Sequence, residues 1–176
     1  MYSPENHSFF KGFYTGVGSR TAPLYIMYMM SELAMIFEQQ GYVLRSGCAF
    51  GADAALEDVL IYPQYTSEIY IPNKNYPKSV DTNFKPNYIV PQDRFGNSFD
   101  GLYRQAMRII HDYNIIGKSW KNCKEYIMNF HNASVFQVLG LDLQTRSKFT
   151  IAYTPNGEKT PEETSINTGG TATAIH

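Results

Sequence analysis

Three glycine-rich segments constrain the fold of this chain more than any other feature. They are Tyr14–Arg20, Ser46–Asp53 and Thr168–Thr171. The first two each follow a short apolar run and precede a stretch with helical periodicity, and the third opens another loop-to-helix junction. Repetition of strand, glycine loop and helix is typical of βαβ units. The sequence therefore predicts a three-layer, Rossmann-like α/β fold, with a mainly parallel sheet and helices on both faces.

Apolar spacing and helix-ending residues predict the individual elements. From Leu24 to Phe37, apolar residues recur at intervals of three and four, and Gly41 then ends that helix because glycine tolerates the left-handed conformation. The segment 72–91 contains too many prolines for a long helix. We expect an N-terminal arm at 1–11 and a single domain at 12–176, with strands near 12–15, 42–44, 67–71 and 148–153, helices near 21–37, 52–60, 98–113 and 119–140, and a polar loop at 155–167.

Composition restricts the class of protein. The 176 residues suffice for one domain, and a net charge of −1 argues against a general electrostatic grip on nucleic acid. The two cysteines, Cys48 and Cys123, lack metal-ligand spacing, so we expect no metal site and a reducing compartment. We expect no signal peptide, because residues 1–12 contain no apolar run after a basic segment, and the sequence has no run of about 18 apolar residues. We expect a cytoplasmic protein without membrane contact, and we expect no cofactor.

The glycine segments also indicate an anion-binding site. A loop that leaves a parallel strand and opens a helix can present backbone N–H groups and the positive end of the helix dipole. The pattern is neither a dinucleotide fingerprint nor a Walker loop, because the third glycine and the Gly-Lys pair are absent. We expect a phosphorylated ligand to contact Gly16, Gly18, Ser19, Arg20, Ser46, Gly47, Gly51, Asp53, Gly169, Gly170, Thr171 and Thr173.

Several of these side chains have alternative roles. We favour a phosphate contact for Arg20 over a surface ion pair. Asp53 could accept a hydrogen bond from a ribose hydroxyl, or it could cap the helix that follows by accepting from its N–H groups. Glu57 lies one turn further along the same helix, and we expect a structural or solvated carboxylate there. Lys74 and Tyr76 could cover the ligand as a lid, with a solvated loop as the equal alternative.

Taken in order, these segments resemble the SLOG superfamily, which groups DprA/Smf-like proteins with LONELY GUY-type phosphoribohydrolases. The match is closest to small DprA-like proteins of phages and bacteria. The residues that carry the resemblance are Tyr14–Arg20, Gly41–Asp53, Phe136–Gly140, Ser147–Phe149 and Thr168–Ile175. The resemblance implies a Rossmann-like fold with a nucleotide or phosphoribosyl group over the glycine loops. It would place a phage-encoded copy in the host cytoplasm.

Two departures from the phosphoribohydrolase pattern bear on catalysis. His176 stands where the family's third glycine motif would carry its glutamate, and His131 stands at the position of its arginine. Histidine can exchange protons but cannot replace a guanidinium or a carboxylate. The candidate catalytic residues are therefore His131, His176 and Asp53. Family members usually continue with a helix and a strand beyond this point, which leaves two alternatives: a naturally shorter domain, or a sequence that is truncated after His176.

Three functions follow as hypotheses. The first is a non-catalytic protein that senses or sequesters a nucleotide or an ADP-ribose-like molecule, such as a phage protein that captures a host defence signal. The second is a nucleoside-monophosphate phosphoribohydrolase, and the third is a DprA-like module for single-stranded DNA, which the net charge disfavours. The first helix carries apolar residues beyond one face, which predicts a homo-oligomer, a dimer or larger: Tyr25, Met27, Tyr28, Met29 and Met30.

Overall fold

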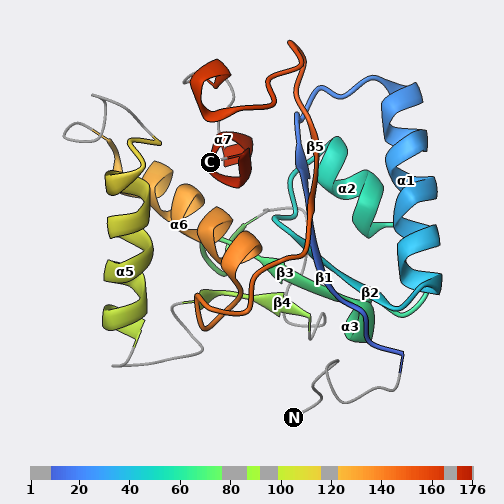
Figure 1. The fold of residues 1–176 in the computed structure, drawn as a ribbon, viewed down its shortest axis with the longest axis horizontal. Helices are drawn as coiled ribbons and strands as arrows, with labels where there is room; N and C mark the ends of the chain where they lie inside the picture. The colour runs from blue at the N-terminus through green and yellow to red at the C-terminus, as the bar shows by residue number, and fades with distance from the viewer. Residues whose placement is uncertain (1–8, 77–86, 92–98, 116–122, 165–169, 176) are drawn as a thin grey trace.

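The computed structural model describes residues 9–76, 87–91, 99–115, 123–164 and 170–175. Its centre is a five-stranded sheet in the order β4-β3-β2-β1-β5, and every neighbouring pair is parallel (Figure 1). The parallel sheet predicted from the glycine segments is confirmed. The strands are β1 (Gly12–Gly18), β2 (Tyr42–Ser46), β3 (Ser67–Tyr70), β4 (Tyr88–Ile89) and β5 (Thr150–Tyr153).

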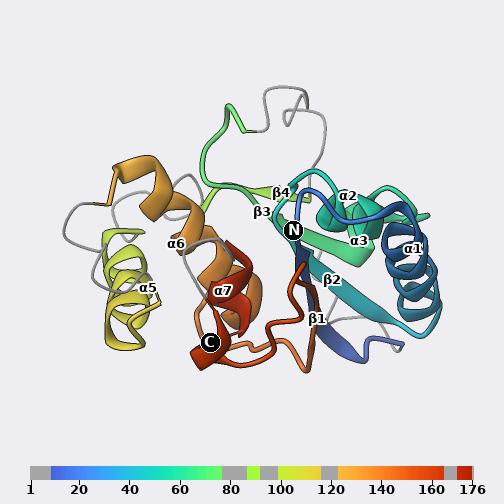
Figure 2. The ribbon, with the colours of Figure 1, turned by 90° about the horizontal axis from the view of Figure 1, so that it is seen from above.

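Helices cover both faces of this sheet, as predicted (Figure 2). One layer contains α1 (Leu24–Gln39), α2 (Ala52–Glu57) and the short α3 (Pro63–Thr66). The other contains α5 (Phe99–Asp112), α6 (Glu125–Leu139) and α7 (Gly170–Ile175). A short 3-10 turn, η5 (Pro161–Glu163), lies in the loop after β5.

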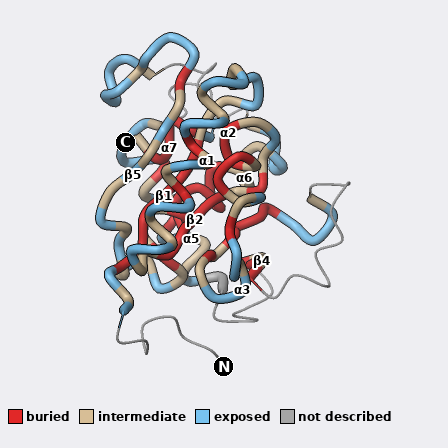
Figure 3. The backbone as a smooth tube through the Cα atoms, turned by 90° about the vertical axis from the view of Figure 1, so that its right-hand side faces the viewer, coloured by how far each residue is buried: buried red, intermediate tan, exposed pale blue. Residues whose placement is uncertain are grey.

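Two apolar clusters fill the spaces between the layers. Tyr14 and Leu44 point from the sheet toward α1 and α2, where they pack with Ala34 and Leu56. On the opposite face, Tyr70, Ile89, Ala106, Ile110, Ala133, Val135 and Phe136 form the second cluster. Figure 3 shows that buried residues concentrate along the central strands and α6. The two faces are apolar because a parallel sheet is covered on both sides.

An ion pair between the buried Arg45 and the partly exposed Glu68 interrupts the second face. The guanidinium of Arg45 donates from Nε to Glu68 Oε2 at 2.8 Å and lies 3.6 Å from the ring centroid of Phe13. A further guanidinium nitrogen donates to the backbone carbonyl of Thr145. Tyr70 donates its hydroxyl to the same Glu68 oxygen at 2.9 Å. This network fixes the loop after α6 against the sheet.

The observed elements differ from the expected ones in a few places. The segment 72–91, for which the sequence predicted only the lack of a long helix, contains the edge strand β4, which is two residues long and closely followed by Pro91. The helix expected at 52–60 ends at Glu57, and the helix expected from 119 has its first described turn at Glu125. Pro23 precedes α1 in an extended conformation rather than standing inside its first turn.

Candidate functional site

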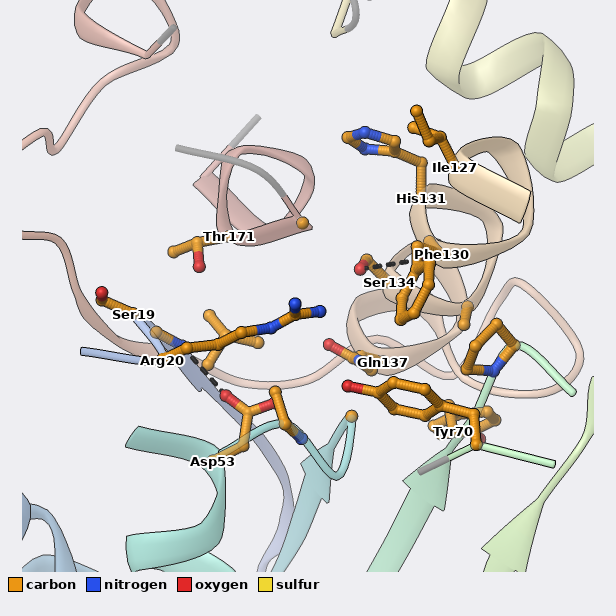
Figure 4. A pocket seen from close by; sticks show the side chains of 18 of the residues that line it. Ser19, Arg20, Asp53, Tyr70, Ile127, Phe130, His131, Ser134, Gln137 and Thr171 are labelled. Carbon is orange, nitrogen blue, oxygen red and sulfur yellow. Dashed lines mark hydrogen bonds between the residues drawn. The ribbon is translucent and has the colours of Figure 1, made fainter. Parts of the chain in front are cut away.

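A cavity of about 550 Å³ lies beyond the carboxyl ends of the strands (Figure 4). Its walls come from the end of β1, the loop after β2, α6, the loop after β5 and the start of α7. Strand β1 lies between β2 and β5, and the helices that connect it to these two neighbours cover opposite faces of the sheet. Helix α1 precedes β2 on one face, and α5 and α6 precede β5 on the other. Ligands of open α/β sheets bind at such a switch point.

The first two glycine loops meet beside this cavity. Gly51 has φ +80°, which favours glycine, and a Cβ there would stand 2.6 Å from the carbonyl oxygen of Ser19 and 2.7 Å from that of Arg20. The N–H of Ala52 donates to the Ser19 carbonyl at 3.2 Å. Glycine at this position is therefore what lets the two loops touch.

The backbone donors of these loops are mostly committed to the protein itself. The N–H groups of Ser19, Ala22 and Ala52 donate to backbone carbonyls. That of Thr21 donates to the Ser19 hydroxyl, and that of Cys48 donates to Glu57 Oε1 at 2.9 Å. The glycine loops were expected to present open N–H groups, and in the structure these five N–H groups, of which Ser19 belongs to the predicted site, are used within the protein. These hydrogen bonds tie the two loops to the rest of the protein at one side of the cavity.

The Asp53 carboxyl accepts hydrogen bonds from both loops and so links them. It accepts from the N–H of Gly18 at 3.1 Å on Oδ1 and from the N–H of Ala49 at 3.3 Å on Oδ2. Burial raises the pKa of Asp53 to about 7, and these N–H groups together with the charge of Arg20 limit the rise. The helix cap considered for Asp53 is not formed, because its oxygens accept from Gly18 at the end of β1 and from Ala49 ahead of α2, and α2 has no side-chain cap hydrogen bond. The carboxyl also lines the cavity.

Glu57, on α2, accepts a hydrogen bond from the second glycine loop. Besides accepting from Cys48, its carboxyl has a pKa raised to about 8 by burial and then by the nearby charge of Asp53. Cys48 itself holds φ +58°, a conformation uncommon for residues with a side chain. The structural role predicted for Glu57 matches this position.

Arg20 extends over the cavity together with two aromatic rings. Its guanidinium carbon lies 5.8 Å from the ring centroid of Phe130, a cation–π distance. Tyr76 meets the edge of Phe130 with the ring centroids 4.8 Å apart. Burial raises the pKa of Tyr76, and the charge of Arg20 opposes that rise. Among the described residues, Arg20 forms no ion pair with a carboxylate.

His131 closes the cavity on the side of α6. A 2.8 Å hydrogen bond joins its Nδ1 to the hydroxyl of Thr173 on α7. Burial lowers the pKa of His131 to about 4, so the ring is neutral at neutral pH. In that state it contributes hydrogen bonding and shape, and it supplies no positive charge to a ligand.

Gln137 is the least expected residue of the site. Its side chain is 4% exposed and lines the cavity, and its Oε1 accepts no hydrogen bond from any described residue. A Cβ on Gly47 would collide with Gln137 Nε2 and approach Asp53 Oδ2 to 3.2 Å. The missing side chain of Gly47 thus allows the Gln137 amide and the Asp53 carboxyl to lie next to each other.

The structure places most of the predicted site residues around this one cavity. Those that line it are Gly18, Ser19, Arg20, Gly47, Asp53, His131, Gly170 and Thr171. Gly16, Ser46, Gly51 and Thr173 do not line it. The side chain of Ser46 is fully buried near Glu57, which argues against a direct phosphate contact. Gly169 and His176 lie outside the described residues.

Of the face that α6 presents to the cavity, sequence reasoning singled out His131 and missed Ser134 and Gln137. His131, Ser134 and Gln137 recur every three residues, which places them along one side of the helix, and all three are buried and line the cavity. Polar residues at that spacing among the apolar residues of α6 were the available signal. Tyr76, one of the two residues considered for a lid, lines the cavity, whereas Lys74 does not.

Two surveys of the described residues complete the site. No group of three or more histidine, cysteine, aspartate or glutamate side chains is placed to hold a metal ion within the described ranges. No described helix combines the length and apolar character required to span a bilayer. Comparison with known proteins finds no matching family model, no matching curated protein and no matching solved structure.

Proposed function

We propose that this protein binds a phosphorylated nucleotide or an ADP-ribose-like molecule in the cavity, as a sensor or a sequestering protein. The observation that carries the proposal is the meeting of three kinds of group in one 550 Å³ space. These are a guanidinium without a carboxylate partner among the described residues, an aromatic pair and buried polar groups. Nucleotides combine a phosphate, an aromatic base and a polar sugar. The volume lies in the range typical of small-molecule sites.

Arg20 would supply the phosphate contact. A guanidinium binds phosphate through paired, charge-assisted hydrogen bonds, and its place over Phe130 holds it at the cavity. The rings of Phe130 and Tyr76 offer faces for a base. Because the N–H groups of the first two loops are largely committed internally, Arg20 carries more of the phosphate interaction than the sequence suggested.

Calorimetry with AMP, ADP-ribose and cyclic nucleotides tests the proposal. We expect binding by at least one of them, weakened about tenfold or more by Arg20→Gln, since charge-assisted hydrogen bonds contribute roughly 1.5–3 kcal/mol. Arg108→Gln on the exposed side of α5 is the matched control and should leave the affinity unchanged. No heat of binding at high micromolar concentration for any of these ligands would reject the proposal.

Hydrolysis of an N-glycosidic bond is the second candidate, and the pKa of Asp53 near 7 favours it. A carboxyl that is partly protonated at neutral pH can donate a proton to the departing base while water adds to the sugar carbon. Chromatography of the ligand after long incubation separates the two functions. Intact nucleotide supports binding alone, whereas release of free base that is lost in Asp53→Asn would establish catalysis.

We also propose that the chain self-associates through the outer face of α1. Leu24, Tyr25, Tyr28 and Met29 are 58–70% exposed, whereas Met30 on the opposite side is buried. A cluster of large exposed apolar side chains on one helix is typical of an interaction surface. Light scattering of the wild-type chain would show a mass above 20.1 kDa.

A further inference from the structure

The floor of the cavity contains an acceptor that lacks a donor. Gln137 Oε1 is buried from solvent and unpartnered among the described residues, although Gln137 lies on the cavity wall (Figure 4). A buried carbonyl oxygen without a hydrogen bond is costly, and most proteins avoid it. Such groups are retained where a ligand completes them. The terminal amide turns about a broad torsion, so a small rotation can direct Oε1 toward an incoming group.

The neighbour of this amide also accepts hydrogen bonds. Asp53 Oδ2 and Gln137 Nε2 both border the space left by the missing side chain of Gly47. Above its pKa of about 7, Asp53 is an anion, and a phosphate placed on it would meet a like charge. Arg20 lies over Phe130, and its charge opposes the rise in the pKa of Asp53. With two acceptor oxygens, Gln137 Oε1 and Asp53 Oδ2, the floor suits a hydrogen-bond donor.

We infer that Gln137, together with Asp53, is the specificity-determining pair of the site and selects ligands that bring a hydroxyl or N–H donor to the cavity floor. The inference rests on the proposed function, because it takes the ligand's phosphate to bind at Arg20. A donor on a nucleotide can come from the sugar hydroxyls or from the amino group of the base. Either the sugar hydroxyls or the amino group could donate to Gln137 Oε1, so probes that lack one of these groups at a time show which one does.

The experiment measures dissociation constants for three probes by calorimetry. AMP carries both kinds of donor, 2′,3′-dideoxy-AMP lacks the sugar hydroxyls, and purine riboside 5′-monophosphate lacks the amino group. We expect the wild-type chain to bind one of the two analogues about tenfold or more weakly than AMP, the loss that follows from an unfilled buried hydrogen bond. The analogue that weakens identifies the donor.

Gln137→Met tests the residue itself. Methionine has nearly the same length and no group that accepts strongly, so the variant should bind AMP and the weaker analogue with affinities within about twofold of each other. Gln64→Met, on the exposed α3, is the matched control and should keep the wild-type discrimination. Circular dichroism confirms folding, and the comparison of probes on the wild-type chain needs no variant.

The outcomes separate this inference from the proposed function. If the wild-type chain binds AMP and both analogues equally, or if Gln137→Met keeps the full discrimination, the inference is rejected and nucleotide binding stands. If ADP-ribose binds but AMP does not, the inference is also rejected, because AMP carries the phosphate and both donors. If no nucleotide binds, the proposed function and the inference fail together.

Discussion

Replacing Gln137 by methionine should stabilise the ligand-free protein. The Oε1 atom is buried without a donor among the described residues, and leaving such an atom unpaired costs about 1–3 kcal/mol. Gln137→Met removes that atom, keeps the length of the side chain and leaves the neighbours in place. We expect the free energy of unfolding to rise by about 1–2 kcal/mol, which for a chain of this size raises Tm by about 2–4 °C per kcal/mol.

Urea denaturation followed by circular dichroism, without ligand, measures this change. Gln64→Met on the surface of α3 controls for the substitution itself and should stay within about 0.5 kcal/mol of the wild type. A loss of 1 kcal/mol or more in Gln137→Met would refute the reasoning, because it would mean that the amide makes a net favourable interaction in the ligand-free protein. A gain in stability with a loss of binding is the signature of a residue kept for function.

Three further predictions concern the buried carboxyls, the contact between the two glycine loops and the exposed face of α1. Burial raises the pKa of Asp53 to about 7 and that of Glu57 to about 8, so the folded chain holds more protons than the unfolded chain near neutral pH. The free energy of unfolding should therefore fall from pH 7 to pH 8, by at most about 1.4 kcal/mol per carboxyl. Urea denaturation at each pH should show a smaller fall in Glu57→Gln than in the wild type. Gly51→Ala should lower the free energy of unfolding by about 2 kcal/mol or more in the same assay, since a Cβ would meet two backbone oxygens at a positive φ; an unchanged midpoint would contradict the close approach of the loops. Tyr28→Lys should yield a monomer by light scattering if α1 is the interface, whereas an unchanged oligomer would place the interface elsewhere.

The sequence predicted the order of strands and helices because its signals are local. Apolar spacing in α1 and glycine at its end depend only on neighbouring residues. Strand β4 escaped prediction for the same reason. Tyr88 and Ile89 form a strand only because β3 pairs with them, and two residues near a proline carry no local strand signal.

The location of the site could also be predicted, but its chemistry could not. In a parallel sheet the carboxyl ends of the strands meet at one edge, so the loops carrying Gly18 and Gly47 had to converge. Which donors stay open depends on acceptors elsewhere in the chain. Asp53 and Glu57 accept hydrogen bonds from N–H groups of the loops. The sequence does not show which N–H groups lie within hydrogen-bond distance of these carboxylates.

Because carboxylates already accept hydrogen bonds from these N–H groups, the glycine loops have a different physical role from the one expected. An anion-binding loop needs donors that are free before the ligand arrives, yet the carboxyl of Asp53 already accepts from Gly18 and Ala49. A phosphate at that point would have to displace a buried side chain. The same carboxyl gives the cavity floor an acceptor character that Gln137 extends, and Arg20 lies close enough for its charge to oppose the rise in the pKa of Asp53. If a nucleotide binds here as proposed, the loops serve by holding these acceptors and Arg20 in place around one cavity.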